Sequence, residues 1–397
     1  MPRSPSPPPG SSSTDRHLHP TAGDGRHIDP RLGTLSGEGA GITVRDPDTA
    51  WPVADGLQPN VTAASDAVTD TYYDLPVVKA PPWKWYVPTY FAFGGLAGAA
   101  SSLAGALHLT ASQPRLARQL HLVALGGEAL GAGLLIADLG RPSRFHHMLR
   151  VFRPTSPMNL GTWILSTTGA TTALGLLTTT PHPLHTLLHH PRRFFSAQPA
   201  PRFPHPARFS PRALVSRPRS LTTTALSLVG ILSGTALATY TGVLIGNTAI
   251  PLWNATRDRL PVWFAALSAA SLGSVLELVA PFAPITRIYA PVAKTAQLAA
   301  AAAVTHTARA AAVDAPLRRG RARTLWRTAT WLNLASLAAT VASTLRPTRS
   351  LATLAGALGL ASTAVSRFAI AAAGHASAAD PRATFVPQRA HTTPAAT

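Results

Sequence analysis

Acidic residues are rare in the long apolar runs of this 397-residue sequence, so each is a candidate for chemistry. Glu128 lies about midway along the run Leu116–Leu139, and Asp138 lies near its end. A carboxylate at the centre of a bilayer costs roughly 2.5–3.5 kcal/mol on insertion scales, so burial favours the neutral acid, which can exchange a proton. His121 precedes Glu128 by two helical turns, and the three residues predict a polar track along one helix. The alternative is a neutral glutamic acid bonded between helices.

Two further polar residues lie within apolar runs. Glu277 is near the end of the run Leu260–Phe282, where its carboxylate could also extend to water at the surface. Tyr240 begins the segment YTGVLI about two turns inside the membrane, where a tyrosine either binds a ligand or belongs to an aromatic belt. Trp253, which follows a short turn, is predicted to anchor the membrane interface.

A basic loop separates two of the apolar runs. We use this name for Asp138–Trp163, which reads DLGRPSRFHHMLRVFRPTSPMNLGTW. Its large apolar residues recur at i, i+3, i+4 and i+7, which predicts a short amphipathic helix at a membrane surface. These apolar positions are Phe145, Met148, Leu149 and Phe152, and the other faces carry Arg144, Arg150 and Arg153. Asp138 and Arg141 are close enough for an ion pair. The alternative is a loop held against lipid headgroups.

Eight apolar runs are long enough to cross a bilayer at 1.5 Å rise per residue. They predict an all-α polytopic membrane protein with about eight transmembrane helices in two packed four-helix bundles. Glycine pairs four residues apart, Gly94 with Gly98 and Gly127 with Gly131, predict close helix contacts. The runs are Val87–Thr110, Leu116–Leu139, Leu160–Thr180, Leu221–Gly246, Leu260–Phe282, Tyr289–Val313, Thr324–Leu345 and Leu351–Gly374.

The composition supports this class. Charged residues make up 13% of the chain, which is low for a soluble protein, while the formal net charge is +19. Binding to nucleic acid would explain the charge but not the long uncharged runs. The chain has no cysteine, so thiolates of this chain cannot hold an iron–sulfur cluster. Three histidines lie in or near the runs, His108, His121 and His306, and their poor pairing predicts no haem.

The predicted domains are a disordered cytoplasmic tail (1–80), a transmembrane domain (81–375) and a second disordered tail (376–397). The first tail is rich in Pro, Gly and Ser and cannot bury enough apolar surface to order itself. A long basic, Pro-rich loop at 181–220 is expected to be irregular. With an even number of spans both termini lie on one side, which we expect to be the cytoplasmic side of the cell membrane.

Several segments together resemble the NrfD-like family. DLGRP, RF, ML and TSPM in the basic loop are followed by Gly161-Thr162-Trp163, and YTGVL and a P-x-W motif occur near Tyr240 and Trp253. The resemblance runs from about Tyr86 to Gly374. Family members are the membrane subunits of polysulfide reductase-type molybdoenzyme complexes. The resemblance implies about eight helices, no haem, and a site for quinone or quinol beside an iron–sulfur partner. We expect the quinone to be menaquinone.

The resemblance also implies roles for residues. Tyr240 would hydrogen-bond a quinone oxygen. The family often has a histidine near the start of its first helix, where this chain has none, so Tyr90 is the expected substitute. Asp138 and Arg141 would set the local field, and Glu128 and Asp138 would transfer protons.

Partner contacts follow from the same resemblance. The expected partners are an iron–sulfur subunit and a molybdopterin catalytic subunit. The iron–sulfur subunit would dock on Arg144, Arg150 and Arg153. Two other functions stay open: a structural anchor for a redox complex without a quinone site, and a transporter. Few charges lie inside the runs and no repeat is visible, which disfavours transport.

Overall fold

The computed structural model describes residues 26–29, 34–37, 76, 78–110, 112–139, 141–179 and 221–385. The chain divides into two units, residues 1–68 and 69–397. In the first unit, strands β1 (Arg26–Asp29) and β2 (Thr34–Gly37) pair antiparallel. This pairing was not expected in a tail predicted to be disordered. The rest of that tail, the loop 181–220 and the end of the second tail lie outside the described residues.

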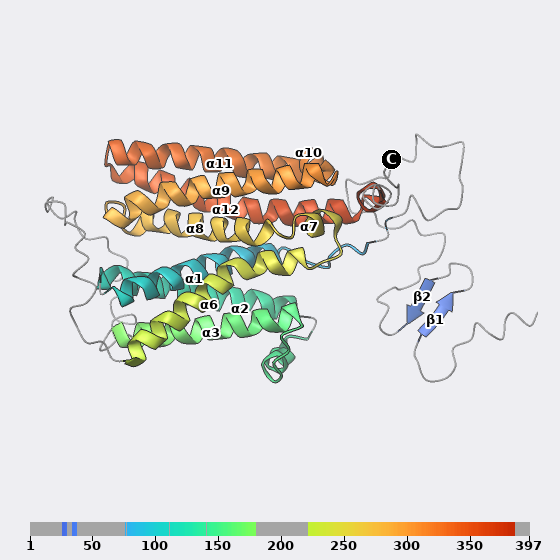
Figure 1. Ribbon diagram of the computed structural model, residues 1–397, viewed down its shortest axis with the longest axis horizontal. Coiled ribbons are helices and arrows are strands. Elements are labelled where there is room, and N and C mark those ends of the chain that lie inside the picture. The colour runs from blue at the N-terminus through green and yellow to red at the C-terminus, as the bar shows by residue number, and fades with distance from the viewer. Residues whose placement is uncertain are drawn as a thin grey trace, which may run out of the picture. The chain divides into compact units, whose positions relative to one another are not determined.

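The second unit is built from long antiparallel helices (Figure 1). The described residues contain eight of them, at the positions of the eight predicted runs, although α12 extends beyond the predicted domain boundary at residue 375. Shorter helices are η3 (Pro142–Leu149), α7 (Pro251–Ala255) and α10 (Ala315–Arg318). The long helices are α1 (Tyr86–Leu109), α2 (Pro114–Asp138), α3 (Pro157–Thr179), α6 (Leu221–Gly246), α8 (Leu260–Val279), α9 (Pro284–Ala310), α11 (Gly320–Leu345) and α12 (Arg349–Ala378).

These helices form two four-helix bundles, as predicted. The first bundle contains α1, α2, α3 and α6, and the second contains α8, α9, α11 and α12. The bundles meet where α1 and α6 pack on α8, and where α1 packs on α12. We call the end of the unit that carries η3, α7 and α10 the loop face, and the other end the opposite face.

Five of the described helices are long and apolar enough to cross a membrane: α1, α2, α6, α8 and α12. The chain is therefore a multi-pass membrane protein. The helices α3, α9 and α11 have the required length but do not meet the same measure of hydropathy. Eight spans therefore stay a prediction.

Glycines bring the helices of the first bundle together. A Cβ atom added at Gly98 of α1 would lie 2.5 Å from the carbonyl oxygen of Gly234 on α6. Gly127 of α2 also lies close to α1, since its Cβ would be 3.0 Å from the carbonyl oxygen of Phe93. The predicted close contacts at both glycine pairs are therefore present.

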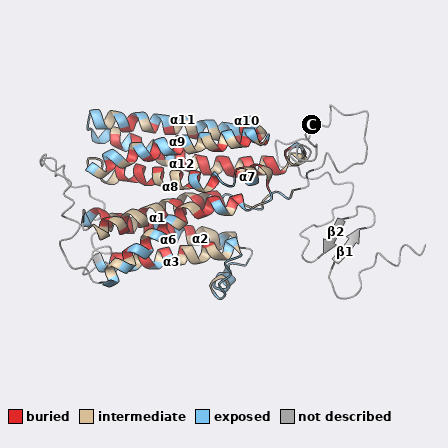
Figure 2. Cartoon of the chain, in the orientation of Figure 1, coloured by how far each residue is buried: buried red, intermediate tan, exposed pale blue. Residues whose placement is uncertain are grey.

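Trp253 does not anchor the interface, contrary to the prediction. It is fully buried, and its indole N–H donates to the carbonyl oxygen of Ile370 on α12 at 3.0 Å. Trp83 stacks on it with ring centroids 5.2 Å apart, and Gly374 leaves the space that the indole fills. The apolar core is continuous around this point, where buried residues of α7, α8 and α12 gather (Figure 2).

Gly98→Ala tests the α1–α6 contact. The new methyl group would meet backbone atoms of α6, which cannot rotate away, so we expect a loss of about 1–3 kcal/mol in stability. The matched control is Gly126→Ala on α2, where an added Cβ has no neighbour within 4 Å. Thermal unfolding in detergent should show a lower midpoint for Gly98→Ala only. Equal midpoints for the two variants would contradict the close contact.

Candidate functional site

Two tyrosines lie in the first bundle, near the loop face. Tyr240 of α6 packs against Gly161 of α3, and its hydroxyl is buried without a hydrogen-bond partner among the described residues. Tyr90 of α1 packs its ring against Gly131 of α2 and Gly94 of its own helix. Both side chains are about 95% buried or more. Tyr240 is therefore not a residue of an exposed aromatic belt.

Glu128 lies about one turn below the ring of Tyr90, because Gly131 follows it by three residues on α2. The carboxyl group is buried and bonded across the bundle, not along its own helix. Thr172 of α3 donates a hydrogen bond to Glu128 Oε1 at 3.0 Å, and Ser101 of α1 is 3.0 Å from the Thr172 hydroxyl. The second carboxyl oxygen, Oε2, has no partner among the described residues. This oxygen can accept a further hydrogen bond from a group that enters the bundle.

A water-sized cavity of about 10 Å³ continues this line toward the opposite face. Ser101, His108 and His121 are among its lining residues. His121 is 5% exposed, and neither ring nitrogen has a hydrogen-bond partner among the described residues. A water molecule in this cavity would satisfy the imidazole and join it to the Ser101 hydroxyl.

The polar side chains therefore follow a different line from the predicted track. This line includes His121 and Glu128 but runs through side chains of α3 and α1 in between. Asp138 lies ten residues beyond Glu128, about 15 Å along the helix, and is half-buried at its end. Thr172 and Ser101 were not identified from the sequence, because hydroxyl groups are common throughout the apolar runs.

Polar side chains from neighbouring helices contact α3 at its glycines. Gly161 accommodates the Tyr240 ring, Gly169 lies against Glu128 Oε2, and Gly175 lies against the His121 ring. A Cβ atom at Gly175 would be 2.7 Å from His121 Cε1. Gly161 and Gly175 thus each provide space for one ring, whereas a Cβ atom at Gly169 would be 3.6 Å from Glu128 Oε2, an ordinary contact distance.

The basic loop differs from its prediction in two respects. Its helix η3 is a 3₁₀ helix that ends at Leu149, with no buried residue, where an amphipathic α-helix extending to Arg153 was expected. The three-residue turn of a 3₁₀ helix does not keep positions i, i+4 and i+7 on one face. Asp138 and Arg141, both described, form no ion pair, and Arg141 is exposed.

Asn159 at the start of α3 holds the end of this loop. Its side-chain NH₂ donates to the carbonyl oxygens of Met148 and Val151, at 2.7 and 2.9 Å. Its side-chain oxygen accepts from the backbone N–H of Arg153 at 2.7 Å. Phe152 also packs edge-on against Trp163. The sequence analysis did not identify Asn159, although an amide just after a TSPM turn is a possible capping signal.

The loop presents a mixed basic and apolar surface. The side chains of Arg144, Arg150 and Arg153 are all exposed, as predicted for a partner-binding surface. Large apolar side chains are exposed beside them in the sequence, namely Phe145, Val151, Phe152 and Met158. Exposed apolar side chains among polar ones are typical of surfaces that meet another protein or a lipid headgroup layer.

Fold and site together define a class: a multi-pass helical membrane protein with a buried tyrosine pair and carboxyl group beneath a basic loop. A model of the family described as polysulphide reductase, NrfD, matches residues 74–298, more than half of the chain. The chain belongs to the NrfD family, whose members are membrane components of polysulfide reductase-type complexes. A search of curated proteins returned no match.

Asn159→Ala tests the anchoring of the basic loop. Three hydrogen bonds are lost, at about 0.5–1.5 kcal/mol each, so the loop should open at least about tenfold more often. Trypsin should then cleave after Arg150 correspondingly faster in the detergent-solubilised chain. The control is Asn247→Ala, because that amide donates only to its own helix, at the carbonyl oxygen of Val243. Identical cleavage rates in the two variants would show that Asn159 does not hold the loop.

Proposed function

We propose that this protein is the quinone-reactive membrane subunit of a multisubunit oxidoreductase. It exchanges electrons between a quinone pool, menaquinone in our proposal, and an iron–sulfur partner subunit of a molybdoenzyme complex. The observation that carries the proposal is the buried, unpartnered hydroxyl of Tyr240, which lies near Tyr90 and in the same bundle as Glu128. We further propose that the loop face lies on the cytoplasmic side of the cell membrane.

The residues near the loop face fit a quinone headgroup by their hydrogen-bonding chemistry. Burial of a hydroxyl without a partner is costly, so the Tyr240 O–H is poised to donate to an incoming oxygen atom. Tyr90 provides a second phenol on the neighbouring helix α1. Asp138 and Arg141, at the end of α2 and in the loop above, contribute charge to the local field.

Proton supply falls to Glu128. Reduction of a quinone takes up two protons with its two electrons, so a buried site needs a proton route. The Glu128 carboxyl exchanges its proton through the Thr172 and Ser101 hydroxyls with the cavity at His121. This route leads to the opposite face, while Asp138 serves the loop face.

Glu128→Gln separates a working quinone site from a structural anchor. The amide keeps the size of the side chain and can still accept from Thr172, but it cannot titrate. We expect quinone-coupled turnover to fall by about 10²-fold, the lower end of the contribution of a positioned proton-transfer group. Activity of the same membranes with an artificial soluble electron carrier, which bypasses the quinone, should be retained.

The deciding quantity is the ratio of these two activities in matched membranes. An unchanged ratio would make Glu128 structural. If Tyr240→Phe and Asp138→Asn also left the ratio unchanged, the chain would be an anchor without a quinone site.

Reversing charge on the basic loop tests partner docking. Arg150→Glu with Arg153→Glu replaces two exposed cations that would steer an acidic partner surface. Recovery of the iron–sulfur subunit with the purified chain should fall, and the remaining complex should dissociate at lower salt. The control is Arg346→Glu with Arg349→Glu, an exposed pair at the opposite face. Equal recovery for both double variants at every ionic strength would place the docking surface elsewhere.

A further inference from the structure

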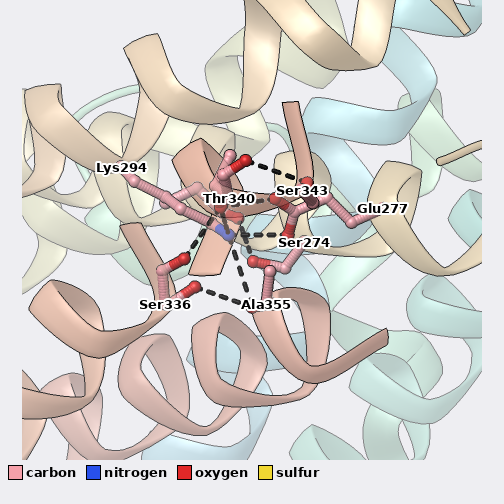
Figure 3. A network of polar contacts seen from close by, with 8 residues as sticks. Ser274, Glu277, Lys294, Ser336, Thr340, Ser343 and Ala355 are labelled. Atoms are coloured by element: carbon pink, nitrogen blue, oxygen red, sulfur yellow. Dashed lines mark hydrogen bonds and ion pairs between the residues drawn. The ribbon is translucent and has the colours of Figure 1, made fainter. Parts of the chain in front are cut away.

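The second bundle encloses a buried ion pair that the quinone site does not use (Figure 3). Lys294 of α9 lies 2.6 Å from Glu277 Oε2 of α8, and their side chains are 1% and 3% exposed. Thr340 of α11 joins both groups, because its hydroxyl donates to Glu277 Oε1 and accepts from Lys294 Nζ at 2.7 Å. The Lys294 ammonium also donates to the carbonyl oxygen of Ala355 on α12, at 3.3 Å.

This arrangement corrects the expectation for Glu277. Its carboxylate does not extend to water at the opposite face, although it lies only two residues from the end of α8. Lys294 was not identified from the sequence at all. The signal was present, since a lysine inside an apolar run is as costly as an acid and requires a partner.

Polar side chains continue from the pair toward the loop face, about one turn apart on each helix. On α11, Ser336 and Asn333 precede Thr340 by four and seven residues. On α9, Gln297 follows Lys294 by three residues and donates to Ser362 of α12 at 3.2 Å. These side chains face one another inside the bundle. We call this set the polar column, and it comprises Glu277, Lys294, Thr340, Ser336, Asn333, Gln297, Ser362 and Ser366.

The column ends near the loop face in a second water-sized cavity of about 10 Å³. Gln297, Asn333 and Ser366 line it together with Trp263 and Trp326. Two buried atoms of these lining residues, Asn333 Oδ1 and Trp263 Nε1, have no hydrogen-bond partner among the described residues. One acceptor and one donor without partners at a polar cavity are the signature of a bound water.

We propose that the polar column is a proton path through the second bundle, with Glu277 and Lys294 as its exchange site. A proton from the opposite face binds the Glu277 carboxylate and breaks the ion pair. The Lys294 ammonium, no longer facing a negative charge, releases a proton to the Asn333 cavity and the loop face. The Glu277 O–H bond then breaks as its proton moves to the Lys294 amine, which restores the ion pair. One proton has crossed, and no electron is involved.

A purely structural role is the competing explanation, because buried ion pairs also specify how helices pack. The surroundings favour exchange. Among the described residues of these four helices, Arg367 is the only other fully buried charge, and it faces away from the column, toward Ser268 and Gly95. Tyr289, near Gly273, is the closest titratable group on α9 toward the opposite face. The pair therefore lies alone between the nearby opposite face and the polar column.

The test is proton flux through the full chain in phosphatidylcholine–phosphatidylglycerol vesicles. A potassium gradient with valinomycin sets the membrane potential, and trapped pyranine reports the internal pH. We expect wild-type vesicles to conduct protons above protein-free vesicles, and Glu277→Gln with Lys294→Met to lose that flux. The control Thr295→Ala, an exposed neighbour bonded to its own helix, should conduct like wild type.

A second variant tests the path without changing the ion pair, in case the first variant loses flux because it misfolds. Asn333→Leu blocks the column with an apolar side chain of similar size and leaves the ion pair in place, so flux should again be lost. Wild-type flux equal to that of protein-free vesicles would overturn the proposal, as would full flux in Asn333→Leu. The vesicles contain neither quinone nor partner subunit, so such a failure would leave the proposed quinone function untouched.

Discussion

A polar side chain between helices in hydrocarbon must find its partner inside the protein, because no water is available there. Such a side chain also needs room between the helices. Helix α3 has no Cβ atom at Gly161 and Gly175, so the phenol of Tyr240 and the imidazole of His121 can approach its backbone. The first bundle is in this sense built around side chains that larger residues on α3 would exclude.

The two bundles compensate their buried acids with different chemistry. In the first, the acid Glu128 has no basic partner among the described residues and is bonded to the hydroxyl group of Thr172. In the second, an acid and a base compensate each other, and Thr340 holds both. The seam between the bundles combines apolar contacts, such as Phe91 of α1 against Phe264 of α8, with the buried guanidinium of Arg367, which faces Ser268 of α8 and Gly95 of α1.

The helices could be predicted from the sequence because long apolar runs with few charges have little alternative to a helix in a bilayer. The buried acid Glu128 could also be predicted, since a carboxylate is so costly in hydrocarbon that one inside an apolar run stands out in the sequence. Its partner Thr172 could not, because it lies 44 residues away in sequence and many hydroxyls were equally eligible. The same holds for the pairing of Glu277 with Lys294. The loop helix was misjudged since prolines at both ends leave too few residues for a stable α-helix, and i, i+3 bonds form instead.

The stack of Trp83 on Trp253 bears on how the chain is made. Its parts come from the segment before α1, from α7 and, through Ile370 and Gly374, from the last helix. During synthesis Trp83 emerges from the ribosome almost 300 residues before Gly374, and the indole of Trp253 has no carbonyl to bond until α12 follows. The hydrogen bond from the Trp253 indole can therefore form only after α12 has been synthesised, and this bond ties the start of the helical unit to its end.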